Sequence, residues 1–409
     1  MAGSWRASTW GEEISLEYGR ALRGDDEATG PYRVFGTNGP IGWTSEPLAQ
    51  GPGVILGRKG AYRGVQYSRE PFFVIDTAYY VVPKRDLDMR WLYYAIKYYR
   101  LGDVDDGSPV PSTTRAAVYM LNLDVPPPDE QHAIAHILGT LDDKIELNRR
   151  MSETLEAMAR GIFKSWFGHF DPVRAKAEGR DPGVPQLVAD LFPDSFEASE
   201  LGEIPKGWEV GRFGDVVEQL RDQESPLSSA NDLFRHFSIP AFDEGQTPKP
   251  EYGQSIKSLK SRVPAGVILL SKLNPEIERV WMVDVRPGER AVCSTEFLVL
   301  RPLSPFTRSY VYCLARSSLF RRQIEGLVTG TSKSHQRAHV DSILNLAVVV
   351  PPPPIIATFD HSAHSLLART LDCRRESHTL AALRDGLLSK LVSGELRVKD
   401  AERFAAQLP

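Results

Sequence analysis

The feature that most constrains this chain is an internal repeat. The segment Arg149–Gly161 reads RRMSETLEAMARG, and 225 positions later Arg374–Gly386 reads RRESHTLAALRDG. Seven of these thirteen positions are identical. Self-similarity at a fixed offset is typical of a duplicated structural unit, so it predicts two copies of one design rather than a single large fold.

The repeat extends beyond the matched helix segment. The same offset carries Pro126 onto Pro351, and each proline follows an apolar run, LNLDV in the first copy and NLAVVV in the second. Each copy is therefore expected to contain a strand, a proline stop and a long helix. Upstream, at shifted offsets, Trp10-Gly11-Glu12 matches Phe213-Gly214-Asp215, and GVIL occurs in both copies. The copies share little between these anchors, which suits a molecule that reads two different things at a fixed distance.

Composition restricts the class of protein. The 409 residues are 42% hydrophobic and 25% charged, which predicts two to four globular domains. We expect no membrane association, because no run approaches the roughly 20 apolar residues of a membrane span and no secretion signal begins the chain. The three cysteines, Cys293, Cys313 and Cys373, predict neither disulfides nor a zinc site and fit a cytoplasmic protein. A net charge of −4 argues weakly against a nucleic-acid partner.

The expected fold class is α+β, with two mixed α/β domains and two long helices. Short apolar runs such as GVILG and PFFVIDTAYYVVP predict strands, and MRWLYYAIKYY has helical spacing. The predicted boundaries are a first globular domain at 1–128, a long helix at 129–170, a connector at 171–206, a second globular domain at 207–353, a second long helix at 354–395 and a tail at 396–409.

The two long helices carry coiled-coil patterns. In the first helix a stripe recurs in steps of four and three residues, namely Ile134, Leu138, Leu141, Ile145, Asn148, Ser152, Leu155, Ala159, Ile162 and Trp166. The second helix gives Phe359, Ala363, Leu366, Thr370, Cys373, Ser377, Leu380, Arg384, Leu387 and Leu391. We predict that the helices pack on each other as an antiparallel pair with pseudo-two-fold symmetry, each about 50 to 60 Å long. In the alternative, each helix lies on its own globular domain.

Three segments of the sequence resemble conserved regions of a known protein family. The run PPPDEQHAIAHILGTLDDKIELNRRMSETLEAMARGIFKSWFGHFDPVRAKAEGR resembles the central conserved region of the specificity subunit of Type I restriction-modification systems. The tail LLSKLVSGELRV looks like the C-terminal conserved region of that family, and LGEIPKGWE looks like the entry into a second target recognition domain. The resemblance spans essentially the whole chain, although the two globular domains match only in their general framework and not in their detailed sequence.

The resemblance implies a non-catalytic, cytoplasmic subunit that reads DNA. Each target recognition domain would read half of a split, asymmetric site in double-stranded DNA, and the helices would set the gap between the halves. Two methyltransferase subunits and a restriction or translocase subunit would dock on this scaffold. No cofactor is expected in this chain, since S-adenosylmethionine and ATP with Mg²⁺ would bind to the partner subunits.

The residues agree with the absence of a catalytic centre. We find no phosphate-binding loop, no [DN]-P-P-[YF] methyltransferase motif and no metal-ligand cluster. The trio Asp142-Asp143-Lys144 is superficially similar to a nuclease site, but consecutive residues fan over different helix faces and are better interpreted as a solvated surface. A standalone nuclease with an unrecognised centre and a purely structural coiled-coil tether remain the alternative functions.

Candidate DNA contacts in the first domain lie in glycine-flanked loops. Arginine forks match guanine or phosphate oxygens, and asparagine suits an adenine edge. The candidates are Asn38, Arg58, Lys59, Tyr62, Arg63, Thr113, Thr114 and Arg115. The alternatives are a hairpin turn with solvated charges for the loop around Arg58, a left-handed turn for Asn38, and helix capping for the threonines.

The second domain offers candidates at corresponding places. Lys272 and Asn274 stand where the GRKG loop stands in the first domain, and the loop before the final strand corresponds to the segment containing Arg115. The latter group comprises Ser332, Lys333, Ser334, His335, Gln336 and Arg337. The aromatic residues Trp91, Tyr93, Tyr94, Tyr98 and Tyr99, and likewise Trp166 and Phe167, are interpreted as packing residues rather than base-stacking platforms.

Overall fold

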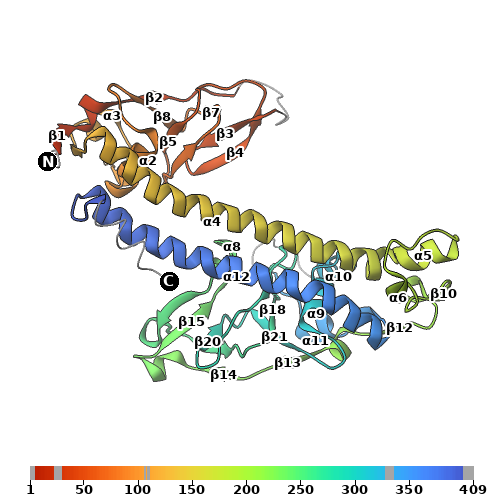
Figure 1. The fold of residues 1–409 in the computed structure, drawn as a ribbon. Helices are drawn as coiled ribbons and strands as arrows, with labels where there is room; N and C mark the ends of the chain where they lie inside the picture. The colour runs from red at the N-terminus through yellow and green to blue at the C-terminus, as the bar shows by residue number, and fades with distance from the viewer. Residues whose placement is uncertain (1–4, 23–29, 106, 108–110, 328–335, 399–409) are drawn as a thin grey trace. The chain divides into compact units, whose positions relative to one another are not determined.

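The computed structural model describes residues 5–22, 30–105, 107, 111–327 and 336–398, which form two compact units (Figure 1). Unit 1 consists of residues 1–146 and 379–409, and unit 2 consists of residues 147–378. Two long helices, α4 (Pro128–Phe163) and α12 (Pro353–Val392), cross this division. Each helix therefore contributes one part to each unit.

Unit 1 is built on a four-stranded antiparallel sheet, in the order β2-β8-β5-β6, with a three-stranded sheet, β4-β3-β7, and a strand pair, β1-β9. Its strands are β1 (Arg6–Thr9), β2 (Ile14–Tyr18), β3 (Tyr32–Gly36), β4 (Gly39–Thr44), β5 (Gly53–Gly57), β6 (Val65–Ser68), β7 (Phe72–Val74), β8 (Ala78–Pro83) and β9 (Asn122–Val125). Its helices, besides its parts of α4 and α12, are α1 (Trp10–Glu13), α2 (Met89–Tyr98), η1 (Leu101–Asp103) and α3 (Arg115–Tyr119).

Unit 2 holds a four-stranded sheet, β13-β21-β18-β19, a five-stranded sheet, β14-β17-β20-β15-β16, and the pairs β12-β22 and β10-β11. Its strands are β10 (Phe196–Ser199), β11 (Gly202–Pro205), β12 (Glu209–Arg212), β13 (Val217–Leu220), β14 (Gln223–Glu224), β15 (Leu233–Phe237), β16 (Lys249–Tyr252), β17 (Lys260–Arg262), β18 (Ile268–Ser271), β19 (Val280–Met282), β20 (Arg290–Cys293), β21 (Phe297–Pro302) and β22 (Ala347–Val350). Its shorter helices are η2 (Lys164–His169), α5 (Asp171–Ala177), α6 (Gln186–Ala189), α7 (Phe213–Val216), η3 (Pro226–Ser229), α8 (Ile239–Asp243), η4 (Gly253–Ser255), α9 (Arg308–Ala315), α10 (Ser318–Glu325) and α11 (Val340–Leu344).

The duplication expected from the sequence is present in the strand order. The four-stranded sheets have the same connectivity, with the GVIL strands β5 and β18 each between two neighbours. All five residues of β5 and all four of β18 are buried, as expected for apolar strands at the centre of a sheet. The units differ in the second sheet, which gains two strands, β14 and β17, in unit 2. The copies therefore share a frame and diverge in the insert.

The two long helices begin at the prolines that the sequence marked. Helix α4 starts at Pro128, and Asp129 and Glu130 occupy its first turn, where carboxylates stabilise the positive end of the helix dipole. Helix α12 starts at Pro353. The first helix ends differently from the prediction, because the α-helix stops at Phe163 and continues as a π-helical turn to His169. Trp166 and Phe167 in this turn are buried in the core of unit 2, so the interpretation of them as packing residues is confirmed.

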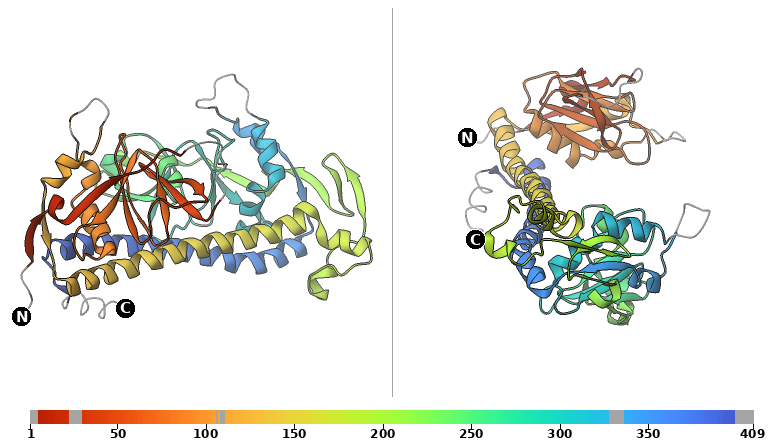
Figure 2. Two further views of the ribbon diagram at one scale, coloured as in Figure 1. Left: turned by 90° about the horizontal axis from the view of Figure 1, so that it is seen from above. Right: turned by 90° about the vertical axis from the view of Figure 1, so that its right-hand side faces the viewer.

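Within each unit the two helices run side by side in opposite directions (Figures 1 and 2). In unit 2 the rings of Phe163 and Phe359 are 5.6 Å apart, while nearer the other end of this part Cys373 Sγ lies 3.5 Å from Met151 Sδ. In unit 1 Ile134 and Leu138 of α4 share a core with Leu391 of α12. The predicted antiparallel pairing is therefore confirmed, and the heptad stripe of α4 faces inward.

A buried asparagine lies on the stripe in unit 2. The side chain of Asn148 is fully buried, and its Nδ2 donates to Glu376 Oε2 at 2.9 Å. Ser152 donates to the carbonyl of Asn148 at 2.8 Å, within the same helix. Polar residues within a heptad stripe can fix the register of paired helices, and one such contact crosses between the helices at Asn148.

The expectation of a solvated surface for Asp142-Asp143-Lys144 was wrong for Asp142, whose side chain is largely covered, whereas the Asp143 side chain is 43% exposed although it is paired. Asp142 accepts hydrogen bonds from Tyr94 Oη at 2.6 Å and from Arg384 Nη1 at 2.6 Å. Asp143 pairs with Arg90 of α2, whose Nη2 also donates to the carbonyl of Gly139 at 2.9 Å. A side chain at Gly139 would collide with this guanidinium, because its Cβ would lie 2.5 Å from Arg90 Cζ.

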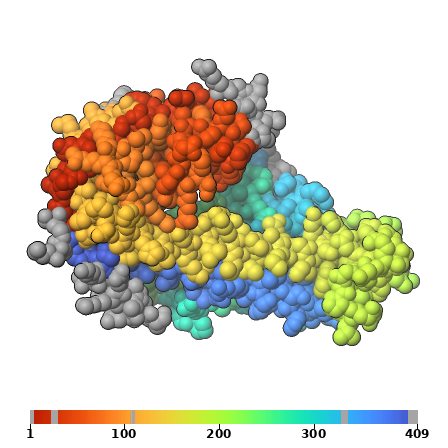
Figure 3. All heavy atoms as spheres, turned by 45° about the horizontal axis from the view of Figure 1, so that its top comes forward, coloured from red at the N-terminus to blue at the C-terminus, as the bar shows by residue number. Residues whose placement is uncertain are grey.

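These contacts hold the first globular domain on α4. In Figure 3 the first part of α4, in yellow, lies directly against the red and orange surface of unit 1. The aromatic residues of α2 belong to the same core, in which Trp91 and Tyr94 are fully buried, so the interpretation of the cluster as packing is confirmed. The hydrogen bond from Arg90 holds the pKa of Asp143 below its ordinary value.

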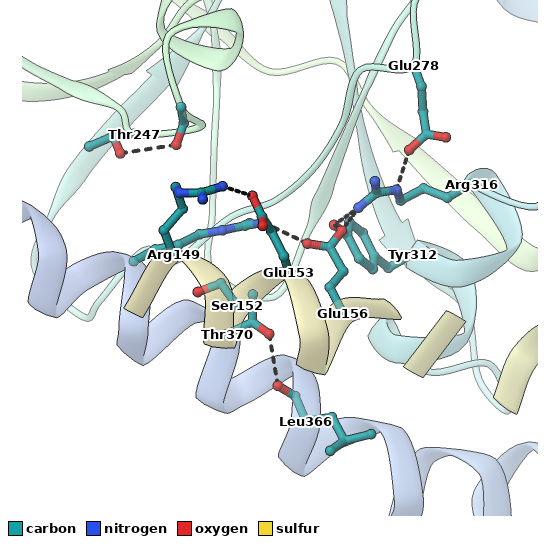
Figure 4. A network of polar contacts seen from close by, with 12 residues as sticks. Arg149, Ser152, Glu153, Glu156, Thr247, Glu278, Tyr312, Arg316, Leu366 and Thr370 are labelled. Atoms are coloured by element: carbon teal, nitrogen blue, oxygen red, sulfur yellow. Dashed lines mark hydrogen bonds and ion pairs between the residues drawn. The ribbon is translucent and has the colours of Figure 1, made fainter. Parts of the chain in front are cut away.

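A matching polar network holds the second globular domain on the helices in unit 2 (Figure 4). Glu156 of α4 is buried, and it accepts from Tyr312 of α9 and pairs with Arg316 and with Arg374, the last at 2.7 Å. Arg316 also pairs with Glu278. In both units, therefore, a carboxylate of α4 receives a tyrosine from the globular domain and an arginine from α12.

The segment predicted as a connector, residues 171–206, belongs to unit 2. It folds into α5, α6 and the β10-β11 hairpin, and Phe192 and Ile204 are buried in the core of the unit. Leu187 of α6, by contrast, is 84% exposed. The docking therefore depends on the rings and branched side chains that follow it.

Candidate nucleic-acid interface

In unit 1 two of the predicted loops are joined by backbone hydrogen bonds. The amide of Thr113 donates to the carbonyl of Arg58 at 2.9 Å, and the amide of Gly60 donates to the carbonyl of Pro111 at 3.0 Å. Lys59 and Ser112 form an isolated β-bridge between them. The loop that follows β5 is thus joined directly to a segment more than 50 residues further along the sequence.

Unit 2 contains the same junction of two loops, with the corresponding backbone hydrogen bonds. The amide of Ala338 donates to the carbonyl of Lys272 at 3.0 Å, and the amide of Asn274 donates to the carbonyl of Gln336 at 2.8 Å. Leu273 and Arg337 form the isolated bridge. The positional correspondence that the sequence indicated between the two pairs of loops is confirmed at this junction.

The backbone of the two junctions is alike, whereas the side chains differ. The bonds match Arg58 with Lys272, Lys59 with Leu273, Gly60 with Asn274, Ser112 with Arg337 and Thr114 with His339. Gly60 and Asn274 both have positive φ, at 105° and 46°, a conformation that glycine and asparagine adopt most readily. Two surfaces with one backbone frame and different functional groups suit the recognition of two different ligands.

Arg58 and Arg115 both stack on Tyr18, at the end of β2. Their guanidinium carbons lie 4.9 and 4.0 Å from the centre of its ring. Arg58 also donates to the carbonyl of Asp76 at 2.9 Å, and Arg115 lies 3.5 Å from Glu17. Tyr18 is 48% exposed, so the two guanidinium groups are arranged around an accessible ring.

Three further candidates of unit 1 are exposed and available. The Tyr62 side chain is 79% exposed, and Asn38 and Lys59 are exposed as well. No side-chain hydrogen bond or ion pair ties any of the three to another residue in the described part of the chain. Asn38 lies in the two-residue turn between β3 and β4, but the left-handed backbone expected there belongs to Gly39, whose φ is 130°.

Three candidates of unit 1 have structural roles instead. Thr113 is fully buried, and its hydroxyl donates to the carbonyl of Val104 at 3.0 Å, so its side chain cannot reach a ligand. Thr114 caps α3 by accepting from the amide of Ala117 at 3.4 Å. Arg63 donates to the carbonyls of Gly102 at 2.6 Å and Gly60 at 3.0 Å, which fastens the loop from within. Prediction from sequence could not separate these residues from the exposed ones, because the burial arises from distant segments.

In unit 2 Arg337 is exposed and forms a bidentate pair with Glu296, at 2.7 and 3.0 Å. This hydrogen bonding raises the pKa of Arg337. Lys272 and Asn274 are partly exposed, and the ammonium group of Lys272 has no partner in the described part of the chain. Ser332, Lys333, Ser334 and His335 lie outside the described residues, and Gln336 is partly exposed.

Two residues at these surfaces were missed by the sequence analysis. Tyr18 ends an alternating strand, ISLEY, and the only signal was an aromatic residue at a strand end. Glu296 lies beside the junction of unit 2 with no sequence signal. Tyr79 supports the unit 1 surface from behind, since its hydroxyl donates to the carbonyl of Thr113 at 3.2 Å and burial raises its pKa to about 12.

The described part of the chain shows no group of three or more His, Cys, Asp or Glu side chains that could hold a metal ion. Among the same residues, no helix is long and apolar enough to cross a membrane.

Comparisons with known proteins agree with this architecture. A family model described as Type I restriction modification DNA specificity domain matches residues 19–157. The Type I restriction enzyme MjaIX specificity subunit of Methanocaldococcus jannaschii is 25% identical over 332 residues, covering 78% of this chain and 72% of that protein. The HindI specificity subunit of Haemophilus influenzae is 25% identical over 358 residues, covering 73% of this chain and 74% of that protein.

A solved structure has the same fold. The S subunit of a Type-I restriction-modification system from M. genitalium superposes with a TM-score of 0.60 at 15% identity, covering 95% of this chain and 96% of that one.

Each unit thus carries one copy of an α/β frame with a junction of two loops, anchored on the paired helices. Residues 19–157 match the Type I restriction modification DNA specificity domain, and the chain is similar over most of its length to Type I restriction enzyme specificity subunits.

Proposed function

We propose that this chain is the non-catalytic specificity subunit of a Type I restriction-modification complex and reads a bipartite, asymmetric site in double-stranded DNA. The observation that carries the proposal is the repeated junction, in which Arg58 and Lys272 occupy the same backbone position in two units that otherwise differ in side chains. One frame used twice with different donors and acceptors suits two half-sites of different sequence.

Arginine and exposed polar groups supply the chemistry of recognition. Arg58 and Arg115 around Tyr18 offer bidentate donors for guanine or phosphate, and Asn38 offers the donor and acceptor pair that suits adenine. At the junction of unit 2 the donors are Lys272 and Arg337, with Glu296 as an acceptor beside them. The overall charge of −4 is compatible with this proposal, because phosphate contact requires a local basic surface.

The chemistry of methylation and cleavage is assigned to partner subunits. We propose two methyltransferase subunits that use S-adenosylmethionine and a restriction subunit that uses ATP and Mg²⁺, with no cofactor in this chain. The nuclease alternative loses its one candidate, because Asp142 and Asp143 are committed to Arg384 and Arg90.

The test is to map methylated positions in DNA from cells that express this chain with its modification subunits. Arg58→Ala should abolish or relax recognition of one half-site, and Arg337→Ala should do so for the other. Each variant should leave the bases read by the other unit unchanged. If both variants methylate the wild-type site as before, or if both change the same half-site, the assignment of one half-site to each unit is wrong.

A further inference from the structure

Unit 2 contains a groove that plays no part in the proposed reading of DNA. It has a volume of about 770 Å³ and is lined by the end of α4, the π-helical turn η2, the start of α10 and the strands β11 and β22. None of the loop residues at the junction, Lys272, Asn274 or Arg337, lines it. This volume is within the usual range of ligand-binding sites in proteins.

The lining of the groove is strongly basic. It includes Arg160, Lys164, Arg174 and Arg322, whereas Glu203 is its one carboxylate. Lys164 and Arg322 are exposed and have no hydrogen-bond or ion-pair partner in the described part of the chain. Arg174 stacks on Phe196 with its guanidinium carbon 5.0 Å from the ring centre, which leaves most of its donors unused. Such an excess of cations attracts a ligand with several negative charges.

The floor of the groove is apolar. The ring of Tyr310 lies 5.4 Å from that of Phe163 and 5.2 Å from that of Phe167. All three residues are buried, so their ring faces are not free to stack on bases. Leu319, at the start of α10, is 37% exposed in the lining and offers an accessible apolar contact.

The cations are spread along the groove rather than focused on one point. Arg160 of α4 and Lys164 of η2 are one turn apart, whereas Arg174 lies on α5 and Arg322 on α10. Cations carried by separate segments around the groove can pair with several negative charges of one ligand. An extended anionic chain therefore fits the lining better than an isolated anion.

We infer that this groove binds an acidic peptide segment of a partner protein, with carboxylates paired to Lys164 and Arg322 and an apolar side chain against Leu319. Charge complementarity and the apolar contact carry the inference together, since a sugar-phosphate backbone would use only the cations. The inference goes beyond the reading of DNA and does not depend on it.

The test uses the full chain and a fluorescein-labelled peptide of about twelve residues in which glutamates flank a leucine. We expect binding by fluorescence anisotropy that weakens when the glutamates become glutamines and when the leucine becomes serine. The double variant Lys164→Glu/Arg322→Glu should weaken binding at least about ten-fold, which corresponds to ~1.4 kcal/mol. Lys257→Glu, an exposed reversal elsewhere in unit 2, should change it little.

Thermal unfolding of each variant establishes that the fold is intact, and a labelled duplex without a recognition site serves as the competing ligand. Equal binding of the glutamine peptide, or unchanged affinity in the double variant, would overturn the inference. So would displacement of the peptide by the duplex together with a larger loss of duplex affinity in the double variant, because the groove would then be a nucleic-acid site. Binding of the peptide by Arg58→Ala and Arg337→Ala chains that no longer recognise DNA would separate the two functions.

Discussion

Arg384 of α12 donates from Nη1 to Asp142 Oδ1 of α4 at 2.6 Å, on the heptad stripe where an aliphatic side chain would ordinarily stand. Both side chains are largely covered, with 18% and 22% of their surface exposed. The Asp142 carboxylate also accepts a hydrogen bond from Tyr94, so contacts to both Arg384 and Tyr94 depend on this one side chain. The positive charge of Arg384, at the interface between the two helices of unit 1, is thus paired with the Asp142 carboxylate on the facing helix.

Arg384→Met should destabilise unit 1, because it leaves the Asp142 carboxylate half-buried with only Tyr94 as a partner. We expect a loss of about 1 to 3 kcal/mol, reduced from the cost of a fully buried pair by the partial exposure of both groups. The additional change Asp142→Asn should recover part of it. The thermal midpoint measures both effects, and Arg180→Met, at an exposed pair with Glu178, is the control that should shift it little.

Tyr62→Ala should weaken DNA binding without lowering stability. The side chain is 79% exposed, so it contributes little to the core. Loss of one contact to DNA should cost about 1 kcal/mol, or roughly five-fold in affinity. Gel-shift titration of the assembled complex measures the affinity. An unchanged affinity would remove Tyr62 from the interface.

Thr113→Val is the matched variant at a buried position. It should lower stability without changing the recognition of DNA. It removes a donor from the carbonyl of Val104 in the core of the junction, which should cost about 1 to 3 kcal/mol of stability. The bases that the complex recognises should stay the same, because the side chain does not reach the surface. A changed recognition sequence with an unchanged thermal midpoint would contradict the structural role assigned to Thr113.

Unit 2 should become less stable in mild acid because of His236. Burial lowers its pKa below the ordinary value of 6.5, and the contact with Glu251 at 3.2 Å opposes this only in part. The unfolded chain therefore binds the proton more readily, and the stability that neutral His236 preserves is complete above about pH 6.5 and falls as the pH drops below it.

The thermal midpoint measured between about pH 5 and 8 tests this. His236→Gln should flatten the fall, by at most about 1.4 kcal/mol for each pH unit. Parallel curves for the variant and the wild-type chain would mean that other groups cause the acid sensitivity.

The length of the paired helices should set the gap between the half-sites. One heptad inserted after Glu146 and another after His378 keep the seam in phase and lengthen both helices by about 10 Å, or about three base pairs. Methylation mapping should then find the same bases with a wider gap. An unchanged gap would refute the role of the helices as a spacer, and an insertion in α4 alone should impair assembly because it breaks the pairing.

The frame of this protein could be predicted from its amino-acid sequence. The repeat at 225 residues, the proline stops and the heptad stripes are local or periodic signals, so they predicted two α/β domains, two long helices and their antiparallel pairing. The side chains that face one another across the seam were not predictable, because Asp142 and Arg384 are 242 residues apart. For that reason the sequence predicts a solvated Asp142, although its side chain is largely covered in the structure.

Which loop residues are free to bind a ligand could be learned only from the folded chain. Arg63, Thr113 and Tyr62 all offer polar groups in the sequence, yet Thr113 is buried and Arg63 is bound to backbone carbonyls while Tyr62 is exposed. Burial and hydrogen bonding depend on segments brought together by the fold, and a linear pattern of residue types carries no record of them. The basic groove of unit 2 arises in the same way, from helices and strands that are distant in the chain.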